Sequence, residues 1–257
     1  MLKFKNVNIV FGVLLLTLIA TGLVGKFNFW LIGCLVLLYS VIVFYGVYFI
    51  QSNFFIPVYC SANTTSKEIA LTFDDGPSEE HTRQIAEFLQ QNNIQATFFC
   101  IGRRINENEE LLKELHKKGH LIGNHSYSHH FWFDLFSTDK MLDDLNKTDE
   151  QVKRIIGLQP KLFRPPYGVI NPNLTKAIKK GNYDTVGWNV RSYDTVITDK
   201  NKLLAKLTTA LKPGAVFLLH DTCKITLEVL PEFVKTAKKQ GYKFVRVDKL
   251  FKIKGYA

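Results

Sequence analysis

Residues 71–82 read LTFDDGPSEEHT and place two aspartates directly behind a run of apolar side chains. Adjacent residues of a regular strand point to opposite faces, so Asp74 and Asp75 can serve one site only if the strand ends beside them. The apolar run predicts a short buried strand, Gly76 and Pro77 predict its end, and Ser78 is the predicted N-cap of the next helix. Both aspartates then lie on a loop behind a strand, where β/α folds carry their chemistry. A simpler interpretation also fits: one aspartate bonds the turn and the other is solvated.

The chain beyond residue 66 alternates short apolar runs with amphipathic stretches, such as the one that carries Leu111, Leu112 and Leu115. This alternation predicts a parallel sheet covered by helices. A distorted (β/α) barrel with about seven strands fits the pattern, and an open doubly wound sheet is the alternative. The runs are IALTF (69–73), ATFFCIG (96–102), HLIGNH (120–125), LFRPPYG (162–168), YDTVGWNV (183–190), AVFLLHD (215–221) and KFVRV (243–247).

Two uncharged, largely apolar segments, 7–24 and 27–50, precede this region. Each approaches or exceeds the ~20 residues that a helix needs to cross a bilayer. A cleaved signal peptide is the alternative for the first segment, but it lacks a clear small-residue cleavage site and a second apolar segment follows at once. We therefore predict a hairpin of two transmembrane helices in residues 1–51, a linker in 52–66 and a separate domain in 67–257.

The side of the membrane that this domain faces is left open by the charges. Lys3 and Lys5 outweigh Lys26 in the predicted turn, which favours a cytoplasmic domain. If the first segment were cleaved or failed to insert, the domain would face outward.

The formal net charge of +10 comes largely from lysines at predicted helix ends, so we predict no nucleic-acid partner and a surface suited to anionic membrane lipid. The four cysteines contain no Cys-x-x-Cys pair.

A possible metal site follows the third apolar run. His125 and His129 are four residues apart in HSYSHH, and this spacing predicts one shared face of a helical turn. With a carboxylate, two such histidines form a three-ligand site that keeps a position open for water, as catalytic zinc requires. Asp75, at another strand end, is available as the carboxylate. Histidines at this spacing also often only satisfy hydrogen bonds, so the motif alone is a weak indication.

Two further strand ends carry unusual polar residues. Arg164 stands before two prolines, and it is either a solvated arginine on a rigid loop or an arginine that orients a carboxylate beside a fixed peptide N–H. The run 215–221 ends on His220 and Asp221, a position that suits a general acid as well as a core histidine.

Taken together, the motifs TFDDGP, HSYSH, RPPYG and LLHD resemble those of the polysaccharide deacetylases, metal-dependent carbohydrate esterases that act on N-acetylated sugars. The resemblance extends from about residue 68 to residue 250, and the four motifs occur in the family's order and spacing. It implies a catalytic domain of this family in residues 67–257, which hydrolyses the carbon–nitrogen amide bond of an acetamido sugar. It also implies a divalent metal ion: zinc first, with cobalt, nickel or manganese as alternatives.

The resemblance assigns a role to each residue of the motifs. Asp75, His125 and His129 look like the metal ligands, and Asp74 looks like the catalytic base, held by Arg164. The two neighbouring aspartates would then have different tasks, one binding the metal and the other taking up a proton.

Further roles follow in the same way. The backbone N–H of Tyr167 would stabilise the oxyanion, and His220 would protonate the departing amine. Trp188 and Leu218 resemble the residues that line the pocket for the acetyl methyl group.

The chain departs from the family in the segment WNVRSYDT, residues 188–195. Many members carry an aspartate where Arg191 stands. We therefore predict Asp194 as the partner that tunes His220.

Alternative functions remain at this point. A glycosidase with paired carboxylates and a membrane-anchored glycan-binding barrel without catalysis are the rivals, and both fit the motifs less well. For a deacetylase, the partner is an N-acetylated glycan, such as chitin-like oligomers, peptidoglycan or exopolysaccharide, or else a lipid-linked amino sugar. The sequence leaves the oligomeric state open.

Overall fold

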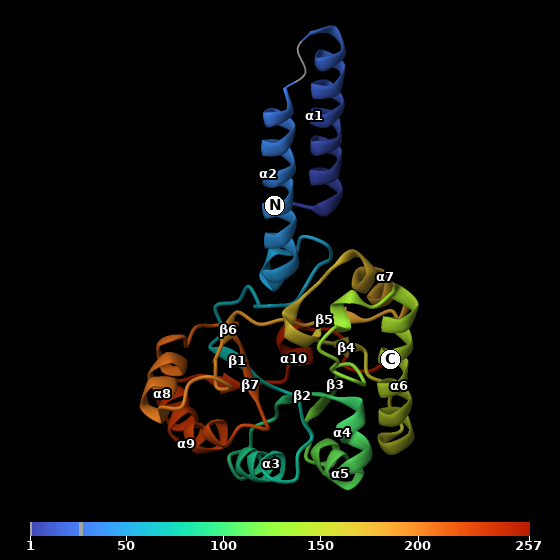
Figure 1. Ribbon diagram of the computed structural model, residues 1–257. Coiled ribbons are helices and arrows are strands. Elements are labelled where there is room, and N and C mark those ends of the chain that lie inside the picture. Colours follow the sequence, from blue (N-terminus) through green and yellow to red (C-terminus); the bar gives the residue numbers. More distant parts are fainter. Residues whose placement is uncertain (1, 26–27) are drawn as a thin grey trace.

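The computed structural model describes residues 2–25 and 28–257; Lys26 and Phe27, predicted in the turn and at the start of the second span, lie outside the described residues. Two long helices, α1 (Phe4–Val24) and α2 (Phe29–Tyr48), lie side by side and stand out from a domain of strands and helices (Figure 1). They have 21 and 20 residues, and an 18-residue window within each has a mean hydropathy of 2.4 and 2.3, so both are long and apolar enough to span a membrane.

The segment behind the hairpin packs closely on the domain. It begins with η1 (Ile50–Ser52), and Ile56 and Val58 are buried in the same cluster as residues of the strands. Phe54 is buried against the hairpin instead, where its ring contacts that of Phe4. Tyr59 then forms a parallel bridge with Val186. The segment 52–66, predicted as a linker, is therefore folded against the strands, while the domain boundaries inferred from the sequence stay predictions.

Eight strands form one sheet, and every pair in it is parallel. The strand order is β5-β4-β3-β2-β1-β7-β6, and β8 pairs with the first residues of β1. The strands are β1 (Glu68–Asp74), β2 (Thr97–Cys100), β3 (Leu121–Asn124), β4 (Leu162–Phe163), β5 (Asp184–Thr185), β6 (Val190–Arg191), β7 (Val216–His220) and β8 (Lys243–Phe244).

This order is that of a barrel. From β1 the strands follow one another around the ring to β5 and return through β6 and β7 to β1, whereas a doubly wound sheet reverses direction at a switch point. Among the described strands no ladder joins β5 to β6, so the ring is open there. The predicted distorted (β/α) barrel is confirmed, and the doubly wound alternative is wrong.

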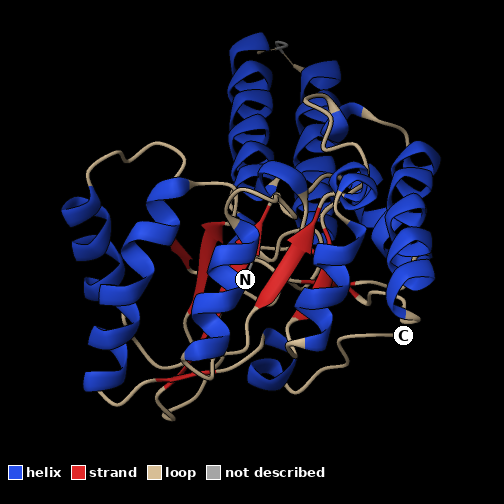
Figure 2. Ribbon diagram, turned by 90° about the horizontal axis from the view of Figure 1, so that it is seen from below, coloured by secondary structure: helices blue, strands red, loops and turns tan. Residues whose placement is uncertain are grey.

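Helices cover the outside of the barrel (Figure 2). They are α3 (Thr82–Gln91), α4 (Gly102–Glu107), α5 (Glu109–Lys117), α6 (Thr138–Ile156), α7 (Pro172–Lys180), α8 (Lys200–Thr209), α9 (Lys224–Lys239) and α10 (Val247–Phe251), with short turns η2 (Phe133–Leu135) and η3 (Pro166–Gly168). Leu71 and Phe73 of β1 pack outward in the same cluster as the buried residues of α3 and α9. The residues between them, Thr72 and Asp74, therefore face the barrel interior.

Two local expectations were wrong. Helix α3 begins at Thr82 with His81 as its N-cap, and Ser78 instead accepts the Thr82 amide hydrogen in the preceding turn. The run 183–190, expected as one strand, breaks at Gly187 into β5 and β6, which lie at opposite edges of the sheet.

Candidate active site

The two aspartates reach the same side because the backbone turns between them. Asp74 is the last residue of β1, and its inward position continues the alternation of that strand. Asp75 has a φ of 78°, in the left-handed region that non-glycine residues rarely adopt. This turn lets both neighbouring carboxylates approach His125: its Nε2 lies 3.9 Å from Asp74 Oδ2 and 3.5 Å from Asp75 Oδ1.

The glycine of TFDDGP leaves room for a third carboxylate. A methyl group in place of the Gly76 hydrogen would lie 1.9 Å from Oδ2 of Asp221. That oxygen accepts a hydrogen bond from the Thr82 hydroxyl at 2.7 Å. Burial and then the charge of Asp75 raise the pKa of Asp221 to about 7.

Asp74 is held by a fully buried arginine. Arg164 donates to Asp74 Oδ1 and to Thr72 Oγ1, each at 2.7 Å, and to the carbonyl oxygens of Val186 and Gly187. The guanidinium also lies 4.2 Å from the centre of the Phe99 ring. Such a buried cation needs its carboxylate, so this pair fixes the orientation of Asp74.

The two histidines meet on a loop, not on a helical turn as the spacing suggested. Ser126 and His129 have φ values of 64° and 43°, and the His129 amide donates to Ser126 Oγ at 3.1 Å. This turned backbone brings the imidazole rings of His125 and His129 to a centroid distance of 5.1 Å.

The ligand atoms of Asp75, His125 and His129 all lie within 4.8 Å of one another. Asp75 Oδ1 is 3.5 Å from His125 Nε2 and 3.4 Å from His129 Nε2, close to the ~3.3 Å edge of a tetrahedron with metal–ligand bonds of about 2.0–2.1 Å. His125 Nδ1 donates to the Arg164 carbonyl at 2.8 Å, so Nε2 is the ring nitrogen that faces Asp75 and is placed to bind an ion. The residues present therefore fit a divalent metal ion.

The protonation of Asp75 and His129 agrees with that fit. Burial, reinforced by the positive charge of His125, lowers the pKa of His129 to about 4. Although burial opposes it, the hydrogen bond from His125 holds the pKa of Asp75 well below its usual range. Burial would also lower the pKa of His125, but the charge of Asp74 and the Asp75 carboxylate raise it, so His125 must release a proton when an ion binds. A neutral imidazole and an ionised carboxylate are the forms that bind metals.

A second ion pair lies at the end of β7. His220 Nδ1 is 2.7 Å from Asp194 Oδ1, and the other oxygen of Asp194 accepts from the His220 amide and from the Thr226 hydroxyl. Burial lowers the pKa of His220, but the hydrogen bond and charge of Asp194 outweigh it and raise the pKa to about 9. Arg191 is exposed, with its guanidinium 5.0 Å from the Tyr193 ring centre.

The remaining predicted residues line the space between these groups. Leu218 lies two positions before His220 on β7, so both point to the barrel interior. Trp188 is buried, and its indole occupies the space that a side chain at Gly168 would need, 2.6 Å from an ideal Cβ. Tyr167 has a φ of 58°, and its ring packs at 4.9 Å from that of His129.

The sequence analysis did not predict the residues that hydrogen-bond to Arg164 and Asp194 and so hold them in place. Thr72 orients Arg164, and Thr226 orients Asp194. The sequence offered one signal, because Thr72 lies two residues before Asp74 on β1 and therefore on the same face of the strand. Thr226 lies on α9 and reaches its partner through tertiary packing alone.

Asp149 of α6 supports the histidine loop. Its carboxylate accepts hydrogen bonds from Asn124, directly before His125, at 2.8 Å and from the Tyr183 hydroxyl at 2.7 Å. Asp149→Ala removes the partner of the buried Tyr183 hydroxyl and one of the two acceptors of the Asn124 amide, which keeps its bond to the Leu145 carbonyl. We therefore expect the free energy of unfolding to fall by about 1–3 kcal/mol. Thermal denaturation of the detergent-solubilised chain measures this.

The matched control is Asp143→Ala on the same helix, where the carboxylate is largely exposed and paired only with Lys147. It should change the stability by less than about 0.5 kcal/mol. Equal melting temperatures for the two variants would remove Asp149 as a support of the loop.

Comparisons with known proteins find relatives of this chain. Residues 61–186 match the family model described as polysaccharide deacetylase. Peptidoglycan-N-acetylmuramic acid deacetylase PdaA of Bacillus subtilis is 35% identical over 192 residues, which cover 73% of either chain. A peptidoglycan-N-acetylglucosamine deacetylase of Bacillus cereus is 36% identical over 197 residues, which cover 73% of this chain and 90% of that one.

A solved structure is similar over the same region. The crystal structure of a peptidoglycan N-acetylglucosamine deacetylase superposes with a TM-score of 0.74 at 31% identity. The superposition covers 77% of this chain and 94% of the other.

Proposed function

Because the chain belongs to the polysaccharide deacetylase family and is a hydrolase of carbon–nitrogen amide bonds in glycans, we propose that it removes N-acetyl groups from amino sugars at a membrane with the help of a divalent metal ion. The observation that carries the proposal is the convergence of three pairs or clusters at the carboxyl ends of the strands. They are the Asp75, His125 and His129 cluster, the Asp74–Arg164 pair and the His220–Asp194 pair.

Asp75, His125 and His129 would hold the ion, which supplies, when bound, a water of lowered pKa and a positive charge beside the acetyl oxygen. Asp74, fixed by Arg164, takes the proton of the attacking water. The backbone N–H of Tyr167 donates to the acetyl oxygen as it becomes negative.

His220 completes the reaction on the amine side. An amide anion is a poor leaving group, so the nitrogen must gain a proton as its bond to the acetyl carbon breaks. With a pKa of about 9, His220 carries that proton at neutral pH. Acetate and the free amino sugar are the products. Trp188 and Leu218 enclose the acetyl methyl group.

The Asp194–His220 pair makes a prediction about pH. Asp194 raises the pKa of His220, so Asp194→Asn should lower that pKa and move the alkaline limb of the kcat profile by roughly 1–2 units toward lower pH. The acidic limb should stay in place. Turnover measured across the alkaline range tests this, and an unmoved alkaline limb would contradict the role of Asp194.

The proposed location rests on α1 and α2, which we take as two membrane-spanning helices. In a cytoplasmic orientation, favoured by Lys3 and Lys5, the substrate would be a lipid-linked amino sugar. In an outward orientation it would be peptidoglycan, on which the similar proteins are named to act. A reporter fused to the C-terminus shows directly on which side of the membrane the domain lies. Loss of residues 1–51 from the mature protein would show a cleaved signal.

The activity itself is tested with the full chain in detergent. Short N-acetylated oligosaccharides should yield free acetate and free amine in equal amounts, a chelator should stop the release, and zinc should restore it. New reducing ends without acetate would mean a glycosidase. Binding without any release would mean a glycan-binding barrel.

A further inference from the structure

Large apolar side chains are exposed directly behind the metal-site loop. Phe131, Trp132 and Leu135 are 69%, 57% and 72% exposed, and the rings of Phe131 and Trp132 contact each other at 4.7 Å. We name residues 131–135 the apolar loop. The metal cluster, the proton-transfer pairs and the barrel core use none of these three side chains. A group of exposed apolar side chains of this size commonly marks a surface of interaction.

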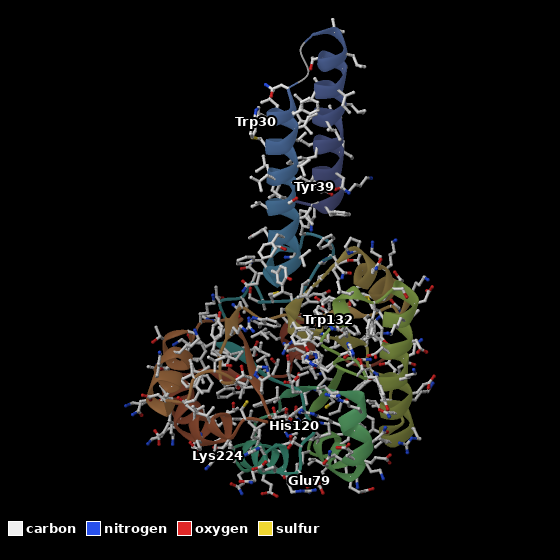
Figure 3. All side chains as sticks on the ribbon, viewed as in Figure 1. Trp30, Tyr39, Glu79, His120, Trp132 and Lys224 are labelled. Carbon is white, nitrogen blue, oxygen red and sulfur yellow. The ribbon has the colours of Figure 1, made fainter. Side chains whose placement is uncertain are left out.

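This loop lies at the base of the hairpin. The Ile170 amide donates to the carbonyl of Val47 near the end of α2, and the next side chain, Asn171, donates to the carbonyl of Asp134 within the loop. Figure 3 shows Trp132 just below the base of α2, whereas Glu79 and Lys224 lie at the far end of the domain. Helix α6 starts three residues after the loop and runs away from the hairpin (Figure 1).

The same loop borders the candidate active site. His129 is two residues before Phe131, and the Phe131 ring lies 6.4 Å from that of Tyr167, which in turn packs on His129. Any surface that receives the apolar loop therefore also lies beside the mouth of the site.

We infer that the apolar loop inserts into the interface of the bilayer that α1 and α2 cross, and that the site takes an amino sugar attached to a membrane lipid. This rests on the proposed function, in which the hairpin spans the membrane. Tryptophan is enriched at the membrane–water interface, and tryptophan, phenylalanine and leucine form the apolar face of segments that insert there. The base of a spanning hairpin lies at that interface, and Ile170 and Asn171 link the loop to it, because Ile170 is hydrogen-bonded to α2 and Asn171 to the loop.

The charges at this end of the domain agree with a lipid surface. Helix α7, which begins next to Asn171, exposes Lys176, Lys179 and Lys180, of which Lys180 pairs with Asp139. The Lys140 ammonium lies 3.6 Å from the centre of the Phe136 ring, directly behind the loop. Exposed lysines around an apolar insertion attract anionic headgroups.

Tryptophan fluorescence of the full chain in anionic nanodiscs tests the insertion. The lipids carry bromine high in the acyl chain, and Trp30→Phe removes the exposed tryptophan of α2. In this variant, bromolipid should still quench part of the emission. In Trp30→Phe/Trp132→Phe the quenching should vanish, because the remaining Trp188 is buried in the barrel. Equal, unquenched emission from the two variants would overturn the inference.

Two substrates test the consequence for activity. Trp132→Ser and Leu135→Ser should deacetylate a lipid-attached N-acetylglucosamine in the same bilayer at least about tenfold more slowly, while their rate on a soluble N-acetylated oligosaccharide stays at the wild-type value. Leu158→Ser, which removes an exposed leucine behind the far end of α6, is the matched control and should alter neither rate.

An equal loss on both substrates would mean that the loop binds sugar rings and would overturn the inference, as would unchanged rates on both. Failure of the proposed function is seen separately, because the wild-type chain would then release no acetate from the soluble oligosaccharide.

Discussion

His125→Ala and His129→Ala should each lower deacetylation by roughly a thousandfold or more and bring the bound metal to background. Both imidazoles point their Nε2 atoms at Asp75 Oδ1, at 3.5 and 3.4 Å, so removal of either leaves two ligands where three are needed. Acetate release from a soluble N-acetylated oligosaccharide and elemental analysis of the same preparations measure the two effects.

His130→Ala is the matched control, because this third histidine follows His129 directly and packs on Phe136, away from the cluster. It should keep both metal and activity on the soluble substrate. A His125→Ala protein with a full complement of metal would contradict the assigned ligand set.

Asp74→Asn should lower kcat by about 10³–10⁴-fold with little change in KM. The amide cannot take up a proton, whereas its oxygen can still accept the hydrogen bond from Arg164, so the geometry of the site is kept. Steady-state kinetics on the soluble oligosaccharide measure the loss.

Folding must be checked for this variant, because Arg164 is fully buried and Asp74 is its carboxylate partner. A melting temperature near that of the wild-type chain separates lost chemistry from lost structure. A folded Asp74→Asn protein with kcat within tenfold of wild type would remove Asp74 as the base.

Much of the barrel could be predicted, because its strands are short buried runs between amphipathic helices. The sequence could not indicate that the run 183–190 would divide, since Gly187 breaks a pattern that is apolar on both sides. It also could not indicate the gap between β5 and β6. That opening depends on the packing of the whole ring of strands, which a local sequence pattern cannot predict.

The residues of the candidate site that lie at strand ends could be predicted from the sequence. The backbone conformation of the loops that carry the others could not. Asp75 and His129 owe their positions to positive φ values, and nothing in DDGP or HSYSHH requires that backbone. For the same reason the helical turn expected from the His125 and His129 spacing was wrong. A turn at Tyr193, with a φ of 63°, brings Asp194 against His220. The sequence of residues 188–195, which departs from the family pattern, gave no reason to expect this turn.

The question raised by the two neighbouring aspartates has a direct answer in the metal content of Asp74→Asn and Asp75→Asn, purified side by side. If Asp75 binds the ion and Asp74 handles the proton, neither variant turns over, Asp74→Asn retains metal at the wild-type ratio, and Asp75→Asn loses it. Loss of metal from Asp74→Asn, or full retention by Asp75→Asn, would contradict this division of roles.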